Sequence, residues 1–238
     1  MGGAVMPTLP TAKNKESFTS VISSSVYMLV EGKDEEAFFN KFFQKNQSLE
    51  TLNLNDNIQI ESIRGIDNLE ATIGALITRT GFEKIKILLI VRDADNSHKS
   101  SFDSVCHILN KHGLPSPLNI NDFSESGESI TTGVYILPGK IEDIAGNMLE
   151  NLCLSIPDNP LIMPYIDDYL QHIIDNPDIV NPKNIHKSKL LVFLASHKDV
   201  PNTLGLGTQK NYFDLNHVNL NLLVEFFAKV KPLLEASS

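Results

Sequence analysis

Short, mostly apolar segments alternate with amphipathic ones along the first half of the chain. They are rich in aliphatic and β-branched residues and end at glycine, proline or charged residues, as strands do. They lie at residues 21–30, 57–63, 85–91 and 133–139. The third is apolar nearly throughout, which is typical of a central strand covered on both faces. Because helical periodicity separates these segments, the pattern predicts an α/β fold with an open, mostly parallel sheet of about four strands flanked by helices.

Helices are predicted in the intervals between these strands. The first is expected to begin at Asp34, whose side chain can cap it. Its buried face carries phenylalanines at helical spacing, namely Phe38, Phe39, Phe42 and Phe43. The second is expected to begin at Asp67, with Glu70 placed three positions later as in a capping box. A third is expected over about residues 100–111, followed by a polar loop over residues 119–132.

The pattern changes after Glu142. Helical periodicity continues, but proline-rich turns at residues 157–164 and 177–182 interrupt it, and a last helix is predicted over about residues 218–234. We therefore expect three parts. They are a flexible N-terminal tail over residues 1–20, an α/β core over residues 21–145 and a helical extension over residues 146–238 that packs on the core.

Charge and composition narrow the functional classes. The 29 acidic residues outnumber the 20 basic ones and give a net charge of −9, which argues against a general grip on phosphate backbones. Any contact with nucleic acid is then expected to be local or bridged by a metal. The longest clearly apolar stretch, residues 87–91, is far short of the ~20 residues that span a bilayer. No membrane anchor or secretory signal is expected, and two cysteines without metal-ligand spacing favour the reducing cytoplasm.

Carboxylates follow two of the predicted strands. Glu31 ends the first strand, and Asp93 and Asp95 follow the third. Ligands of open parallel sheets bind outside the carboxyl ends of the strands, so these side chains would meet if the strands are neighbours. Three clustered carboxylates repel one another, whereas a hard divalent cation stabilises all of them in the ionised form. The pattern therefore predicts a site for Mg²⁺ or Mn²⁺.

The order and spacing of these motifs resemble the Toprim family, the metal-dependent domain of topoisomerases, primases and small nucleases. Residues 29–34 look like its first-strand motif, Arg64-Gly65 lies where the family often has a glycine, and Asp93-Ala94-Asp95 looks like its Asp-x-Asp. The resemblance covers about residues 26–142. It implies a Toprim/Rossmann-like sheet, Asp93 and Asp95 as ligands of Mg²⁺, and Glu31 as general acid/base or a further ligand.

Other residues are weaker candidates. Glu142 follows the fourth predicted strand and is a candidate for a second cation, although an acidic residue there also suits the first turn of a helix. Residues near the first two motifs are candidates for substrate contact, namely Gly32, Lys33, Arg64 and Gly65. The sequence does not choose which basic residue would stabilise a transition state among Lys33, Arg64, Arg92, Lys189 and Lys210. Without a His-Glu-x-x-His motif, a zinc hydrolase is not expected.

These features favour a Mg²⁺-dependent protein that transfers phosphoryl or nucleotidyl groups or hydrolyses phosphodiesters, with nucleic acid or a nucleotide as substrate. A partner ATPase or helicase would supply the domains that usually accompany such a fold. A phosphatase with Asp93 as nucleophile is disfavoured because that arrangement usually sits on the first strand and leaves Glu31 unexplained. A non-catalytic, metal- or nucleotide-binding regulatory module with the same fold stays open. The sequence does not determine the oligomeric state.

Overall fold

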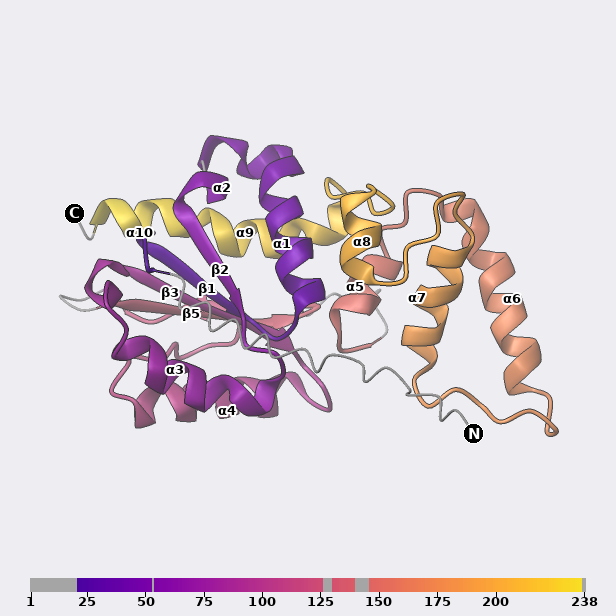
Figure 1. Ribbon diagram of the computed structural model, residues 1–238, viewed down its shortest axis with the longest axis horizontal. Helices are drawn as coiled ribbons and strands as arrows, with labels where there is room; N and C mark the ends of the chain where they lie inside the picture. The colour runs from indigo at the N-terminus through magenta and orange to yellow at the C-terminus, as the bar shows by residue number, and fades with distance from the viewer. Residues whose placement is uncertain (1–20, 53, 126–129, 140–145, 237–238) are drawn as a thin grey trace, which may run out of the picture.

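The fold is α/β, as predicted. A computed structural model describes residues 21–52, 54–125, 130–139 and 146–236. Its central sheet has five strands in the order β2-β1-β3-β5-β4 (Figure 1). The strands are β1 (Val26–Val30), β2 (Ile58–Ser62), β3 (Ile87–Asp93), β4 (Asp122–Phe123) and β5 (Thr131–Leu137). Neighbouring strands are parallel except at one edge, where β4 runs antiparallel to β5. That two-residue strand lies in the segment predicted as a polar loop, because two residues are too few to show a period.

Helices cover the sheet and continue beyond it. The α-helices are α1 (Lys33–Lys45), α2 (Leu54–Asn57), α3 (Leu69–Ile77), α4 (His98–Lys111), α5 (Leu149–Leu154), α6 (Met163–Ile174), α7 (Ile185–Ala195), α8 (Leu204–Gln209), α9 (Asn221–Ala228) and α10 (Val230–Ala236). Short 3₁₀ turns occupy Gln47–Leu52, Ile66–Asn68, Phe82–Lys84, Pro160–Ile162 and Val218–Leu220. No helix in the described part of the chain is long and apolar enough to cross a membrane.

The two faces of the sheet bury separate hydrophobic cores. Along β1, Val26, Met28 and Val30 belong to one core, while Tyr27 and Leu29 belong to the other. This follows from the two-residue period of a strand, which sends successive side chains to opposite faces. The first core also contains the phenylalanines of α1 and the apolar side of α9, whereas the second is closed by α3 and α4. Both faces of the central strands are therefore covered, as the apolar run at 85–91 predicted.

Two predicted helix starts are wrong in detail. The residue that precedes α1 is Gly32, with no side-chain cap, and Asp34 lies one residue inside the helix. Its Oδ1 instead accepts a hydrogen bond from the backbone N–H of Gly205 in α8, at 2.9 Å. Asp67 likewise does not cap: it lies in a 3₁₀ turn, and α3 starts at Leu69 without a side-chain cap. In the first case, a contact distant in sequence replaces the predicted local one.

The predicted last helix is split in two. The α9 helix ends at Ala228 and α10 begins at Val230. Pro232 explains the break, because proline has no N–H to donate to the carbonyl four residues earlier and its ring crowds that carbonyl. The acceptor it leaves without this bond is the carbonyl of Ala228, at the end of α9.

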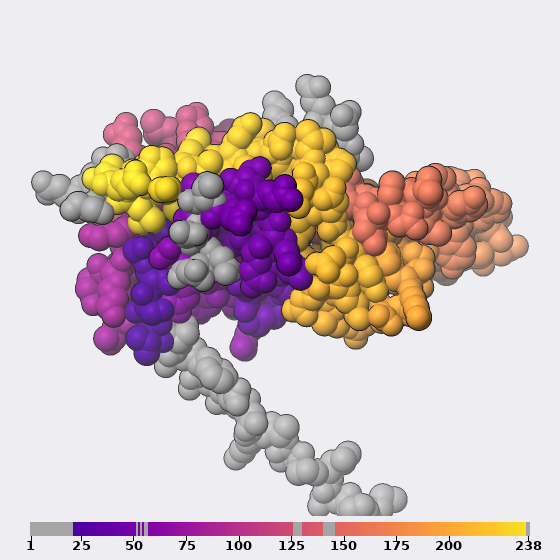
Figure 2. Space-filling view, turned by 90° about the horizontal axis from the view of Figure 1, so that it is seen from above, coloured from indigo at the N-terminus to yellow at the C-terminus, as the bar shows by residue number. Residues whose placement is uncertain are grey.

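The helices after residue 146 occupy two places. Near the C-terminus, α9 and α10 lie along the sheet on the same face as α1 (Figure 1). The helices α5, α6, α7 and α8 gather beyond one end of the sheet, and the orange segment containing α6 and α7 projects from the rest of the molecule (Figure 2). Helix α8 packs closely on α1 at Gly205, where an added Cβ would lie 2.8 Å from the Cβ of Ala37. The division of the chain at residue 145 stays a prediction.

Candidate functional site

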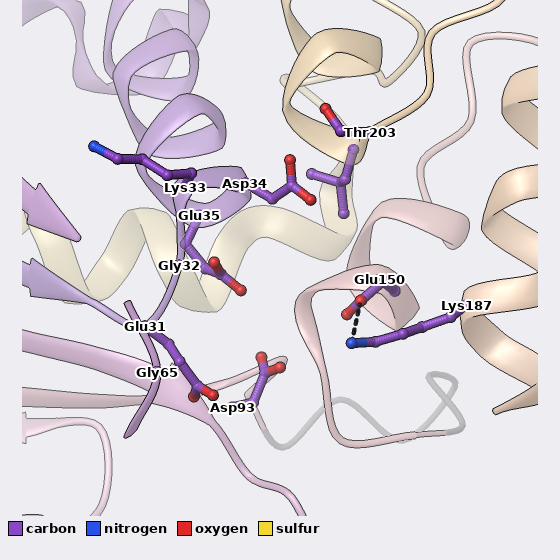
Figure 3. Close-up of a pocket in the computed structure, with 11 residues that line it drawn as sticks. Glu31, Gly32, Lys33, Asp34, Glu35, Gly65, Asp93, Glu150, Lys187 and Thr203 are labelled. Carbon is purple, nitrogen blue, oxygen red and sulfur yellow. Dashed lines mark ion pairs between the residues drawn. The ribbon is translucent and has the colours of Figure 1, made fainter. Parts of the chain in front are cut away.

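A pocket of about 410 Å³ opens at the carboxyl ends of β1 and β3. These strands are parallel neighbours with Val30 opposite Val91, so Glu31 and Asp93 leave the sheet at the same edge. Both line the pocket, together with the start of α1 and residues from α5, α7 and α8 (Figure 3). The structure thus brings together two of the three carboxylates that the sequence placed at this edge.

Glu31 is held half-buried at the end of β1 without full pairing. Its Oε2 is buried and has no hydrogen-bond partner in the described part of the chain. Burial, followed by the negative charge of Asp95, raises the pKa of Glu31 above its ordinary value, although Arg92 and a hydrogen bond from the Asp93 backbone oppose this rise. An unpaired carboxylate oxygen in such a place is available to a proton or a cation.

Asp93 is the most strongly perturbed carboxylate that lines the pocket. Burial, then the negative charges of Glu35 and Glu150, raise its pKa to about 8. Its Oδ1 accepts a hydrogen bond from the backbone N–H of Leu149, at 2.9 Å, which lowers the pKa only partly. Asp93 is therefore largely protonated at neutral pH as long as no cation balances its neighbours.

Three further carboxylates line the pocket, namely Glu35, Glu150 and Asp34, of which Asp34 accepts the hydrogen bond from Gly205. Glu35 of α1 has a raised pKa because of its burial and, among charges, because of Glu150. Glu150 of α5 forms an ion pair with Lys187 of α7 at 3.4 Å, and Glu150 raises the pKa of that lysine. Thr203 and Leu204, at the start of α8, line the same pocket. Sequence reasoning missed all of these as site residues.

The family is decided by a match over most of the chain. A family model described as "Protein of unknown function (DUF3226)" matches residues 25–231. The chain belongs to the DUF3226 family. A comparison with curated proteins finds no match.

One solved structure shows a weak similarity to this DUF3226 protein. It is the C-terminal region of the OLD protein of Xanthomonas campestris pv. campestris, with 13% sequence identity and a TM-score of 0.39. The alignment covers 90% of the DUF3226 chain and 100% of the other. A similarity this weak carries no argument about function.

Asp95 of the DUF3226 protein points elsewhere. Its carboxylate forms a close ion pair with the guanidinium of Arg92, whose side chain is almost fully buried, and it is not among the residues that line the pocket. The turn that carries it is fixed by the amide of Asn147, which donates to the Asp95 carbonyl at 2.9 Å. Asp93 and Asp95 therefore do not share one pocket, although the charge of Asp95 still acts on Glu31.

The weaker candidates divide in the same way. Gly32 and Gly65 line the pocket, and a Cβ at position 32 would lie 2.7 Å from the Oε2 of Glu35, so glycine makes room for that carboxylate. Lys33 reaches the rim, but its amino group points away and pairs with Glu36 at 2.6 Å (Figure 3). Arg64 is exposed and does not line the pocket. Glu142 lies outside the described residues.

The donors around the pocket suit a hard divalent cation in kind. Glu31, Glu35, Asp93 and Glu150 offer only carboxylate oxygens, the ligands that Mg²⁺ and Mn²⁺ prefer. The buried, unpartnered Oε2 of Glu31 is the atom that such an ion would satisfy. Among the described residues no three His, Cys, Asp or Glu side chains already stand together as a ligand set, so binding requires these carboxylates to move toward one another.

Proposed function

We propose that this protein is a Mg²⁺-dependent phosphoryl- or nucleotidyl-transfer protein, or a phosphodiester hydrolase, whose site is the pocket between β1, β3 and α5. Five carboxylates line that one pocket, from the ends of β1 and β3 and from α1 and α5, and this observation carries the proposal. Such a group is costly in the absence of a cation, because burial and mutual repulsion raise the pKa of three of its members. Perturbed carboxylates gathered in a cleft are typical of functional sites.

The carboxylates of the pocket take different roles in the proposed phosphoryl-transfer chemistry. A divalent cation held here would neutralise charge on the phosphoryl oxygens of a substrate. Asp93 and Glu35 are the inner ligands that we propose, because Glu35 is the neighbouring charge that raises the pKa of Asp93 most. Glu31 serves as a further ligand or as the proton-transferring group, since its Oε2 has no other partner in the described part of the chain.

Lys187 supplies the positive charge on the opposite wall. Its side chain is 60% exposed and lines the pocket beside Glu150. A phosphate group approaching the carboxylates would meet this ammonium group. Contact with nucleic acid or a nucleotide is then local, as the net charge of −9 requires.

Titration calorimetry with Mn²⁺ and Mg²⁺ tests the cation site. We expect Glu31→Gln and Asp93→Asn each to weaken binding at least about tenfold, because each removes a proposed anionic ligand. Glu36→Gln is the matched control, since Glu36 lies in the same turn of α1 but pairs with Lys33. Equal affinity in the wild type and in both site variants would refute the cation site.

A phosphodiesterase screen then separates catalysis from binding. Bis(p-nitrophenyl) phosphate and short single-stranded DNA and RNA are incubated with Mg²⁺ or Mn²⁺. Hydrolysis lost in Glu31→Gln but retained in Glu36→Gln supports the enzymatic proposal. Cation binding at this site without hydrolysis of any of these substrates would favour the regulatory module over the enzyme.

A further inference from the structure

A second pocket lies between β5 and α9, on the face of the sheet that α1 also covers. Its volume is about 280 Å³, just below the range of roughly 300–1,000 Å³ typical of sites for drug-sized ligands. It shares no residue with the carboxylate pocket. Its walls are Asn121, Tyr135, Leu222, Glu225, Phe226 and Lys229.

The floor of this pocket carries a buried hydroxyl group. Tyr135 is 1% exposed, and its hydroxyl oxygen has no hydrogen-bond partner in the part of the chain that the structure describes. A Cβ built at Gly139 would lie 2.5 Å from that oxygen, so the hydroxyl lies against the backbone of Gly139. Burial, followed by the charge of Glu225, raises the pKa of Tyr135, so the hydroxyl keeps its proton and is a donor. Native proteins rarely leave such a group unpaired.

The mouth of the pocket is negatively charged. Lys229 is already neutralised, because its Nζ lies 2.9 Å from the Oδ1 of Asp122. Glu225 lies one helical turn earlier on α9, is exposed, and has no ion-pair partner among the described residues. A ligand entering here therefore meets one uncompensated carboxylate at the mouth and one unpaired donor at the floor.

We propose that this pocket binds a small primary amine with an apolar body and a hydrogen-bond acceptor at its far end. The acceptor receives the hydroxyl hydrogen of Tyr135. The body packs against Leu222 and Phe226, and the ammonium group pairs with Glu225. The acceptor and the ammonium group at opposite ends of the ligand match the pocket, in which the Tyr135 hydroxyl is buried and the Glu225 carboxylate is at the surface.

Three commercially available probes of similar size test that order by NMR titration of the full chain, with a metal chelator present. Tyramine carries both polar ends. Phenethylamine lacks the acceptor, and 3-(4-hydroxyphenyl)propionate replaces the ammonium group with a carboxylate. We expect tyramine to bind with a Kd on the order of 1 mM and the other two at least about fivefold more weakly. Absence of tyramine binding at about 10 mM, or equal binding of all three, overturns the proposal.

Two variants locate the binding. Tyr135→Phe keeps the ring and removes the hydroxyl, and Glu225→Gln removes the charge; each is expected to weaken tyramine binding about fivefold. Glu235→Gln, on the exposed surface of α10, is the control and should bind as the wild type does. Thermal unfolding of each variant verifies that it folds. Unchanged affinity in folded Tyr135→Phe and Glu225→Gln overturns the assignment, whatever the outcome of the metal titrations.

Discussion

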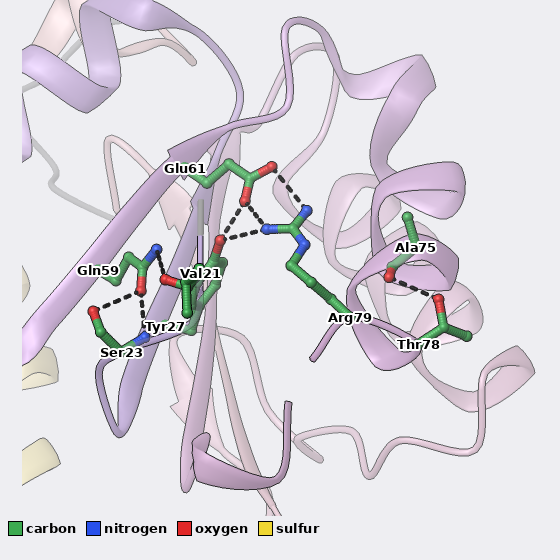
Figure 4. Close-up of polar contacts among 8 residues, drawn as sticks. All are labelled: Val21, Ser23, Tyr27, Gln59, Glu61, Ala75, Thr78 and Arg79. Carbon is green, nitrogen blue, oxygen red and sulfur yellow. Dashed lines mark hydrogen bonds and ion pairs between the residues drawn. The ribbon is translucent and has the colours of Figure 1, made fainter. Parts of the chain in front are cut away.

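Glu61 on β2 and Glu31, which follows the neighbouring strand β1, are half-buried glutamates with opposite surroundings. Glu61 on β2 accepts hydrogen bonds from the Tyr27 hydroxyl and from Arg79, whose Nη1 lies 2.8 Å from its Oε2 (Figure 4). Burial alone would raise the pKa of Glu61, but the hydrogen bonds from Arg79 and then Tyr27 outweigh it and lower the pKa. The Oε2 of Glu31 has no hydrogen-bond partner in the described part of the chain, and the pKa of Glu31 is raised.

This difference separates a carboxylate that stabilises the fold from one that costs stability. A buried carboxylate with a guanidinium and a hydroxyl group is satisfied without any ligand. Glu31 lines the same pocket as Asp93, Glu35 and Glu150. Lys187, which also lines it, already forms an ion pair with Glu150. The surroundings of Glu31 therefore lower the stability of the fold, as is expected of a binding site.

The largest expected effect is on the pH dependence of stability. Asp93 has its pKa raised to about 8, so its folded state binds a proton that the unfolded chain releases near pH 4. The contribution of Asp93 to the free energy of unfolding is therefore fully present below about pH 4 and is lost as the pH rises toward about 8. We expect the unfolding free energy of metal-free wild type, relative to Asp93→Asn, to fall by roughly 5 kcal/mol over this range, because one pKa unit corresponds to about 1.4 kcal/mol.

Urea unfolding at several pH values, with a chelator present, measures that difference. Asp103→Asn is the control, because Asp103 is an exposed partner of Lys99 on α4 and should leave the pH profile unchanged. Parallel profiles for wild type and Asp93→Asn would mean that Asp93 is ionised normally. Glu61 acts in the opposite window: its lowered pKa gives stability that is present above about pH 4.5 and is lost as the pH falls.

The second-largest expected effect is the loss of stability when Glu61 loses its ion-pair partner. Arg79→Met leaves a half-buried carboxylate without its cation, and we expect a loss of about 2 kcal/mol in unfolding free energy. Arg64→Met is the matched control, since Arg64 is exposed and forms no ion pair within the described residues. A change in Arg79→Met no larger than in Arg64→Met would show that the Glu61 cluster does not stabilise the fold.

Apolar periodicity predicted the sheet and its helices because it reports burial directly. The phenylalanine face of α1 and the fully covered β3 follow from spacing alone. Periodicity does not encode the partner of a polar group. Asp34 was predicted to cap a helix, but its partner, Gly205, lies 171 residues away.

Only part of the candidate site could be predicted from the sequence, for the same reason. Glu31 and Asp93 could be placed together because parallel neighbouring strands end at one edge. Glu150 and Lys187 could not, because no spacing relates two short helices of the C-terminal region to the end of β1. Asp95 was grouped with Asp93 by motif, whereas its ion pair with Arg92 depends on a turn in which Asp95 has a φ of 49°.

The smallest expected effect compares the two glutamates most directly. Glu31→Gln and Glu61→Gln are nearly isosteric, so each removes charge with little change in packing. In metal-free protein we expect Glu31→Gln to stabilise by about 1 kcal/mol, because it relieves repulsion, and Glu61→Gln to destabilise by about 1 kcal/mol, because it weakens the bond to Arg79. Urea unfolding near neutral pH measures both. If Glu31→Gln destabilised the protein as Glu61→Gln does, Glu31 would be as well accommodated as Glu61, and its surroundings would not be those of a ligand site.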